Sequence, residues 1–225
     1  MLHQRQIAAD GFAVTEKVLP DAAIATLIAA TGSHLEHGRG GIRNLLALGA
    51  VARLAESQAI RDLVEPVLGA DARAVRGTLF DKTPDANWKV PWHQDLSIAV
   101  QQRVDLDGYG PWSVKAGVVH VQPPVDILEK MLAVRIHLDD CHEENGVVRV
   151  IPGSHAIGRL SVEKIGEITA IARSVSCPVR AGGVLLMRPL LLHASSASSV
   201  PSHRRVIHVD YASAELPAGL SWFQK

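Results

Sequence analysis

The sequence predicts a mainly β protein with helices near its N-terminus (α+β), whose strands form a double-stranded β-helix, the jelly-roll barrel of cupin-like proteins. Two patterns support this fold class. Apolar residues recur at helical spacing between residues 20 and 69, and short β-like runs separated by turn sequences fill most of residues 72–211. Helices followed by many short strands are typical of a barrel with a helical buttress. Because no repeat or linker interrupts the chain, we expect residues 1–225 to form one domain.

The N-terminal part of the chain is expected to contain a strand and three helices. Asp21 is a suitable N-cap for the first helix, in which Ile24 and Leu27 share one side. Ser57 is placed to cap the third helix, and Gly69 to end it. The expected elements in order are a strand over 11–14, a helix from 21, a loop over 33–41, a helix over 42–54 and a helix over 57–69.

After residue 70 the pattern changes to the alternation that is typical of strands. Pro-Pro, Glu-Asn-Gly and Pro-Gly sequences separate the apolar runs as turns would. We expect a turn over 83–87, a loop over 104–111, and either a strand or a short helix over 165–171. The expected strands are 72–80, 114–122, 131–138, 146–151, 177–180, 183–188, 190–193 and 204–211.

Composition restricts the classes of partner. The chain has 23 basic and 23 acidic residues, so it offers no electrostatic reason to expect nucleic acid or an anionic membrane. Cys141 and Cys177 cannot form a disulfide framework, which fits a reducing compartment. The N-terminus lacks the apolar core of a signal peptide, and no apolar run approaches the ~20 residues that span a bilayer. We therefore expect a cytoplasmic protein with a small-molecule partner, and the sequence leaves its oligomeric state open.

One stretch, Trp92-His93-Gln94-Asp95-Leu96, has the residue types and spacing of a metal site. Side chains alternate along an extended chain, so His93 and Asp95 point the same way and are able to bind one ion. A third ligand must come from elsewhere, and His193 is the best candidate. Two His and one carboxylate on one face of an octahedron describe a non-haem Fe(II) site.

Two other His-x-Asp pairs compete with this assignment. His137-Leu138-Asp139 also precedes His193, and it ends a strand in which alternate residues share one face. His208-Val209-Asp210 has no histidine after it and lies in an alternating strand, which favours a core role. Spacing alone therefore leaves open both the His137 pair and the absence of any metal.

Taken in order, these motifs resemble those of the phytanoyl-CoA dioxygenase family of Fe(II)- and 2-oxoglutarate-dependent oxygenases. The resemblance extends from about residue 11 to residue 211. The stretches that carry it are Trp92-His93-Gln94-Asp95-Leu96, Glu144-Asn145-Gly146 followed by Val150-Ile151-Pro152-Gly153-Ser154-His155, His193-Ala194-Ser195, and Arg204-Arg205-Val206-Ile207.

The resemblance implies a jelly-roll fold, Fe(II) as the metal, and 2-oxoglutarate and O2 as co-substrates. It makes His93, Asp95 and His193 both the metal ligands and the catalytic residues, and it sets the His137 pair aside. Arg204 occupies the family's position for binding the distal carboxylate of 2-oxoglutarate. Its neighbour Arg205 is then expected to face the other way, because adjacent residues of a strand do.

Further residues are implied to line the co-substrate pocket. Ser195 shares a face with His193 and is placed to donate to the same carboxylate as Arg204. Thr78 matches a pocket-lining position, although β propensity alone also explains a threonine there. Arg135 departs from the family pattern, which often has an aromatic residue at this point. It binds 2-oxoglutarate, meets an anionic group of the substrate, or faces outward as a surface arginine.

The substrate is not readable from the sequence. The segment after the metal stretch is a candidate lid, and residues there and on the neighbouring strand suggest a small polar or anionic molecule. The candidate substrate-binding residues are Trp92, Tyr109, Trp112, Lys115 and His137. The expected activity is hydroxylation, or another oxidation, of a C–H bond in a small metabolite. The alternatives are a metal-dependent cupin enzyme that is not an oxygenase and a non-catalytic jelly-roll binding domain.

Overall fold

The computed structural model describes residues 2–32, 41–200, 202–217 and 219–224. Its strands form three antiparallel sheets, and two of these face each other across the site described below. The six-stranded sheet has the order β1 (Phe12–Thr15), β11 (Val184–Met187), β8 (Met131–His137), β13 (Arg204–Ala212), β3 (Arg73–Lys82) and β2 (Gly41–Arg43). The four-stranded sheet has the order β10 (Val175–Cys177), β9 (Val148–Val150), β12 (His193–Ser195) and β4 (Val90–His93). This is the predicted jelly roll.

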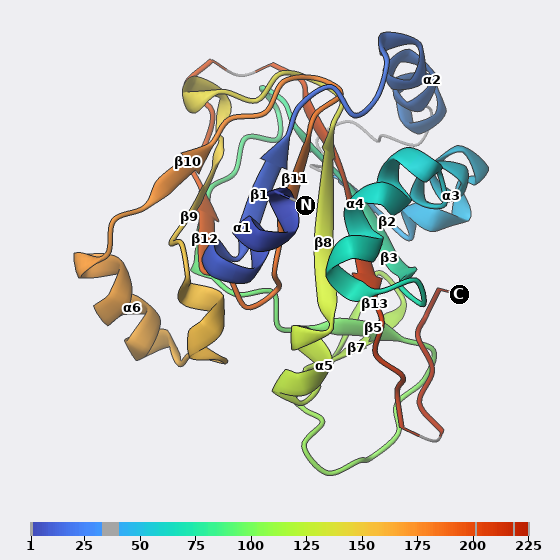
Figure 1. The fold of residues 1–225 in the computed structure, drawn as a ribbon, viewed down its shortest axis with the longest axis vertical. Coiled ribbons are helices and arrows are strands. Elements are labelled where there is room, and N and C mark those ends of the chain that lie inside the picture. The colour runs from blue at the N-terminus through green and yellow to red at the C-terminus, as the bar shows by residue number, and fades with distance from the viewer. Residues whose placement is uncertain (1, 33–40, 201, 218, 225) are drawn as a thin grey trace.

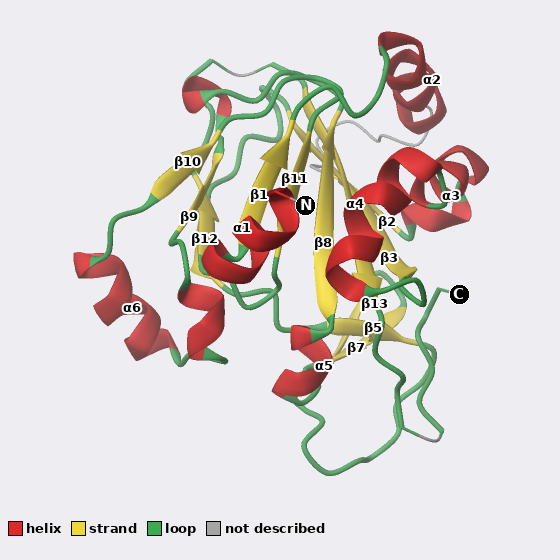
Figure 2. Cartoon of the chain, in the orientation of Figure 1, coloured by secondary structure: helices red, strands yellow, loops and turns green. Residues whose placement is uncertain are grey.

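Among the described residues, a third, smaller sheet and six α-helices complete the fold (Figures 1 and 2). The small sheet has the order β5 (Ile98–Val100), β7 (Val118–Val121) and β6 (Trp112–Lys115). The helices are α1 (Leu2–Asp10), α2 (Asp21–Gly32), α3 (Gly49–Ala55), α4 (Gln58–Leu68), α5 (Val125–Glu129) and α6 (Val162–Ile171). Within the described ranges, no helix has the length and apolar character needed to cross a membrane.

The helices α3 and α4 cover the outer face of the large sheet, as Figure 1 shows. Ile207, Val209 and Tyr211 of β13 pack into one buried cluster with apolar residues of these helices. The hydroxyl of Tyr211 donates to the carbonyl of Ala55 at 2.8 Å, which ties the sheet to the end of α3. The alternate residues of β13, which include Arg204 and His208, face the opposite way, into the barrel. The predicted helical buttress therefore fixes which side of β13 is available to a ligand.

Most of the predicted elements are confirmed, with shifted ends. Six predicted strands are present, namely 11–14 as β1, 72–80 as β3, 131–138 as β8, 146–151 as β9, 183–188 as β11 and 204–211 as β13. The strand predicted at 177–180 corresponds to β10, which begins and ends slightly earlier. Ser57 and Gly69 flank α4 as predicted, although the Ser57 hydroxyl donates to the carbonyl of Leu54 rather than capping the helix. Residues 165–171 belong to the helix α6, which is capped by Ser161.

Three predictions were wrong in a way that matters for the site. Residues 41–43 are not helical but form the edge strand β2, and Asn44 then adopts a left-handed conformation with φ 59°. The single strand expected over 114–122 is a hairpin, which turns at Ala116 and Gly117, where φ is 49° and 76°. The strand expected over 190–193 begins only at His193. The loop expected over 33–41 lies almost entirely outside the described residues.

Candidate metal centre and adjoining pocket

The ligand atoms of His93, Asp95 and His193 lie within 4.8 Å of one another. His93 and His193 are register partners across β4 and β12, and their ring centroids are 4.1 Å apart. Asp95 follows the end of β4, where its backbone N–H donates to the carbonyl of Pro189 at 2.8 Å. Its two carboxylate oxygens lie 3.8 Å from Nε2 of His93 and 3.6 Å from Nε2 of His193. Strand pairing thus brings together residues that are about one hundred positions apart in the sequence.

The hydrogen bonds of the two imidazoles leave the nitrogens that face Asp95 free for a metal. Nδ1 of His93 lies 2.9 Å from the carbonyl of Pro91, and Nδ1 of His193 lies 2.9 Å from the carbonyl of Leu191. A carbonyl only accepts, so both Nδ1 atoms carry the proton and both Nε2 atoms have a lone pair. A backbone carbonyl that fixes the tautomer in this way is typical of metal-binding histidines.

The charge states of the three residues suit a divalent cation. Burial lowers the pKa of His193 to about 4, which keeps this imidazole neutral at pH 7. Burial raises the pKa of Asp95, but the charges around it, of which the Arg76 guanidinium persists at pH 7, outweigh burial and hold that pKa below its ordinary value. A neutral imidazole and an ionised carboxylate are donors that non-haem Fe(II) takes.

The competing His-x-Asp pairs do not form a metal site in the structure. His137 is buried, and within the described residues neither of its ring nitrogens has a hydrogen-bond partner. Asp139 instead accepts from the backbone and the guanidinium of Arg205 at 2.7–2.8 Å. Neither the His137 pair nor the His208 pair belongs to a group of three potential ligands among the residues that the structure describes.

A pocket of about 240 Å³ opens beside the three ligands, between the two larger sheets. Three of the residues predicted for the co-substrate pocket on the large sheet (Thr78, Arg135 and Arg204) face it, as does Ser195 from the opposite sheet. The complete lining is Arg43, Arg76, Thr78, Phe80, Trp88, Val90, His93, Asp95, Lys115, Arg135, Val148, His193, Ala194, Ser195, Arg204 and His208.

One end of this pocket is shaped for a carboxylate. Arg204 is buried, its guanidinium donates to the carbonyl of Gly146 at 2.7 Å, and its Nε has no partner among the described residues. Next to it, the buried ammonium of Lys82 lies 3.3 Å from the hydroxyl of Ser195 and also donates to the carbonyl of Ser196. Burial and the neighbouring Arg204 lower the pKa of Lys82 to about 8. Neither cation forms an ion pair with a described carboxylate, and two buried cations of this kind fit an anionic ligand group.

Gly146 is required at this end of the pocket. Its φ of 82° is in the left-handed region, and a Cβ there would lie 2.7 Å from both Nζ of Lys82 and the carbonyl oxygen of Ser196. The turn Glu144-Asn145-Gly146 therefore contributes directly to the pocket, because it lets the Lys82 ammonium reach the end of β12.

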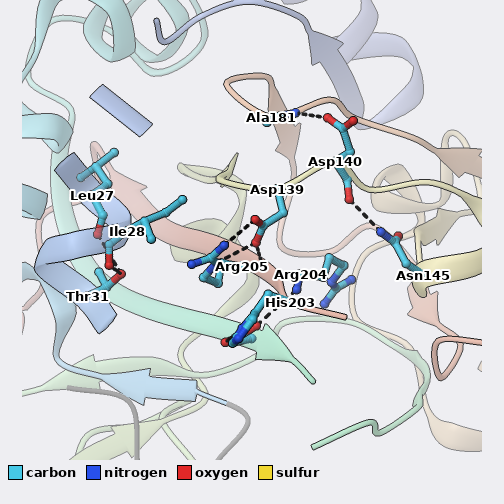
Figure 3. Close-up of polar contacts among 11 residues, drawn as sticks. Leu27, Ile28, Thr31, Asp139, Asp140, Asn145, Ala181, His203, Arg204 and Arg205 are labelled. Atoms are coloured by element: carbon cyan, nitrogen blue, oxygen red, sulfur yellow. Dashed lines mark hydrogen bonds and ion pairs between the residues drawn. The ribbon is translucent and has the colours of Figure 1, made fainter. Parts of the chain in front are cut away.

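The neighbouring arginines Arg204 and Arg205 face opposite ways, as predicted. Figure 3 shows the guanidinium of Arg205 turned to the carboxylate of Asp139, with which it forms an ion pair at 2.7 Å. That pair holds Arg205 outside the barrel, while Arg204 lines the pocket.

Arg135 is turned inward, so the outward-facing alternative is wrong. Its guanidinium donates to Nδ1 of His208 at 3.0 Å, and its Nε has no partner among the described residues. Nε2 of His208 in turn donates to Asp210 at 3.0 Å, and Asp210 accepts from Arg76 at 2.5 Å. Burial and the charge of Arg204 lower the pKa of Arg135 to about 10. This chain of contacts holds the Arg135 side chain against β13.

Of the five residues predicted to bind the substrate, one lines the pocket. Lys115 lines the pocket, but Trp92, Tyr109, Trp112 and His137 do not. The ring of Trp92 stacks under the guanidinium of Arg149, and Tyr109 and Trp112 pack against a separate apolar cluster around the small sheet. His137 is enclosed in the barrel wall, where burial and the charges of Arg135 and Arg204 lower its pKa well below the ordinary value.

Several pocket residues were missed, although a signal for some of them was present. Thr78 lines the pocket as predicted, and the same alternation turns Arg76 and Phe80 into the pocket. It also brings Lys82, which is not in the lining, to the hydroxyl of Ser195. His208 was set aside as a core residue because it lacks a later histidine, and it does have a buried structural role. Arg43 was not predicted as a pocket residue, because residues 42–54 were expected to be helical.

Comparison with known proteins identifies a family and a shared fold. The family model for phytanoyl-CoA dioxygenase (PhyH) matches residues 7–206. A comparison with curated proteins gives no match.

Several solved structures share the fold. AviO1 from Streptomyces viridochromogenes Tue57 is 22% identical, with a TM-score of 0.70 and coverage of 96% of both chains. EctD from S. alaskensis, solved with 2-oxoglutarate and 5-hydroxyectoine, is 20% identical, with a TM-score of 0.73 over 99% of this chain and 78% of its own. The epimerase SnoN, in complex with Fe3+, alpha ketoglutarate and nogalamycin RO, is 21% identical, with a TM-score of 0.72 over 97% and 86%.

Proposed function

The chain belongs to the phytanoyl-CoA dioxygenase family of Fe(II)- and 2-oxoglutarate-dependent oxygenases, and from this premise we propose that it hydroxylates a C–H bond of a small metabolite. One observation carries the proposal: the free Nε2 atoms of His93 and His193 converge with the Asp95 carboxylate beside a pocket that ends in buried cations. This combination provides for both a metal and a carboxylate co-substrate.

We propose that His93, Asp95 and His193 hold the iron. When bound, Fe(II), 2-oxoglutarate and O2 supply an oxidative decarboxylation, in which one oxygen atom goes to the C–H bond and the other to succinate, and CO2 is released. The hydrogen bonds from Nδ1 of both histidines to backbone carbonyls keep the two rings in the orientation that binding requires. Asp95 contributes a negative charge because its pKa lies below the ordinary value, with the guanidinium of Arg76 among the causes.

Arg204 is proposed to bind the distal carboxylate of 2-oxoglutarate, with Ser195 and Lys82 as neighbouring donors. A guanidinium with a free edge suits a carboxylate, since its planar fork matches two oxygens. Thr78 and Arg135 line the space between this end of the pocket and the three ligands. These contacts orient the co-substrate and limit the water around it.

The proposal is tested with anaerobically prepared protein and fresh Fe(II). Addition of 2-oxoglutarate is expected to produce a weak visible absorption band, and exposure to O2 is expected to release succinate slowly even without substrate. A protein that retains metal but gives neither band nor succinate would be a cupin of another kind. Failure to retain metal would indicate a binding domain. Either result contradicts the oxygenase proposal.

A further inference from the structure

The pocket carries a large excess of positive charge. Five cationic side chains line it, namely Arg43, Arg76, Lys115, Arg135 and Arg204, whereas Asp95 is the one carboxylate in the lining. Asp210 adds a second carboxylate because it pairs with Arg76, and the buried Lys82 adds a further cation beside Arg204. Within the described residues, six cations therefore face two carboxylates.

The proposed metal and co-substrate leave this excess unchanged. Fe(II) brings two positive charges and 2-oxoglutarate brings two negative ones, so the loaded pocket has the same net charge as the empty one. The distal carboxylate of 2-oxoglutarate occupies the end formed by Arg204 and Lys82. The cations at the other end stay uncompensated, and a concave site of one sign attracts a ligand of the opposite sign.

Arg43 and Lys115 form that other end, which is the mouth of the pocket. Arg43 lies on the edge strand β2, in register with Thr78 of β3, and Lys115 ends β6 immediately before the hairpin turn at Ala116 and Gly117. The two side chains are exposed and come from different sheets. Arg43 and Lys115 line the same pocket as Arg76. Burial lowers the pKa of Lys115, and the charges of Arg76 and Arg43 lower it further, although Asp95 opposes them. No described carboxylate forms an ion pair with Lys115.

We propose that the substrate is a small acid whose oxyanion group, a carboxylate or a phosphate, is held between Arg43 and Lys115 at the pocket mouth. This inference rests on the proposed function, because it assigns a chemical class to the substrate of that reaction. With the oxyanion at the mouth, the carbon to be oxidised points inward to His93, Asp95 and His193. A pocket of about 240 Å³ that also holds the co-substrate admits only a small molecule or the end of a larger one.

The test measures binding of inorganic phosphate and of acetate to the protein loaded anaerobically with Fe(II) and saturating 2-oxoglutarate, which occupies the inner cations. Tryptophan fluorescence is a suitable readout, because Trp88 lines the pocket and Trp112 lies on the same strand as Lys115. The variants are Arg43→Gln and Lys115→Gln. Matched controls are Arg173→Gln and Lys164→Gln, which change exposed residues outside the pocket.

Saturable binding is expected in the wild type and in both controls, and each mouth variant is expected to weaken it by about tenfold or more. The tighter of the two probes identifies the oxyanion, and succinate release should then increase with acids of that class but not with their neutral amides or esters. Equal binding in all variants, or none in the wild type, would overturn the inference. If the 2-oxoglutarate band is absent while phosphate binding still depends on Arg43 and Lys115, the oxygenase proposal fails and the anion site stands.

Discussion

The imidazole of His208 connects Arg135 to Asp210 across the pocket-facing side of the large sheet. Its Nδ1 accepts from the Arg135 guanidinium and its Nε2 donates to the Asp210 carboxylate, both at 3.0 Å. Asp210 also pairs with Arg76 at 2.5 Å. Arg135, His208 and Asp210 are buried, and Arg76 is partly buried. One carboxylate therefore positions two arginines of the pocket lining, Arg76 directly and Arg135 through His208.

Replacement of Asp210 by Ala is expected to destabilise the protein by about 3 kcal/mol, the lower end for a broken buried pair, because it leaves the partly buried Arg76 and the buried His208 without their partner. Arg76 and His208 both hold the pKa of Asp210 below its ordinary value despite burial, which raises it. The contribution of this carboxylate is therefore present above the unfolded pKa of about 4 and is lost as the pH falls below that value. Urea denaturation at pH 7 and pH 3 measures both effects.

Glu215→Ala provides the control for Asp210→Ala. Glu215 pairs with Arg73 at 2.9 Å, but its side chain is 83% exposed, so its loss is expected to change stability little. Similar losses from the two substitutions would show that the Asp210 contacts do not stabilise the fold.

His193→Ala is expected to abolish stable iron binding, whereas His137→Ala is expected to retain it. The first removes a proposed ligand, and the second removes an imidazole that makes no hydrogen bond among the described residues. The loss of iron affinity should exceed the roughly 10–100-fold that follows from removal of a residue that only orients a ligand. Iron content after gel filtration measures the difference. Retention of iron by His193→Ala and its loss from His137→Ala would reverse the assignment.

Arg204→Ala and Arg205→Ala separate co-substrate binding from stability. Arg204→Ala is expected to weaken 2-oxoglutarate binding about 10–100-fold, because a charge-assisted hydrogen bond to the distal carboxylate is lost. Arg205→Ala breaks a partly exposed ion pair with Asp139, so it is expected to lower stability by about 1 kcal/mol and to leave 2-oxoglutarate binding unchanged. Titration of the visible band and urea denaturation check the two variants. Equal effects on 2-oxoglutarate binding would contradict the assignment of Arg204.

The sequence allowed prediction of features that depend on local pattern or on motif order. The alternation of β8 and β13, the helical spacing before Gly69, and the order of His93, Asp95, His193 and Arg204 were all readable. The opposite orientations of Arg204 and Arg205 followed from strand geometry alone. These features could be predicted because the periodicity of apolar residues, and the spacing and order of motif residues, are properties of the sequence itself.

The missed features depend on which segments pair in the folded chain. Residues 41–43 carry no strong strand signal, and their pairing with β3 is what makes them a strand and brings Arg43 to the pocket. Lys82 could not be predicted as a residue beside the pocket, because Ser195 and Gly146, which it approaches, are far from it in the sequence. Trp92 and Trp112 were predicted to bind the substrate because they lie in or after the metal stretch. In the structure, Trp92 packs against Arg149 and Trp112 packs against the apolar cluster around the small sheet.

Lys82→Met tests the buried ammonium beside Arg204 through the pH dependence of stability in the metal-free protein. Burial and Arg204 lower the folded pKa of Lys82 from 10.5 to about 8, so between these values the unfolded chain binds more protons than the folded one. The contribution of Lys82 to stability therefore rises with pH across this window, and Met removes that rise. The thiol of Cys177, whose pKa is raised to about 12, titrates with the opposite sign but is present in both proteins.

The difference in the free energy of unfolding between wild type and Lys82→Met is accordingly the informative quantity. Between pH 8 and pH 10.5 this difference should change in favour of the wild type by about 1–3 kcal/mol. The upper figure corresponds to the lowering of the Lys82 pKa from 10.5 to about 8, and the lower figure allows for screening by solvent. Urea denaturation at several pH values measures it. Saturating 2-oxoglutarate with a metal should diminish the shift, because a carboxylate beside the ammonium restores its pKa. If the difference in the free energy of unfolding does not change with pH, the pKa of Lys82 is not lowered in the folded protein. That result would contradict the assignment of Lys82 to the co-substrate site.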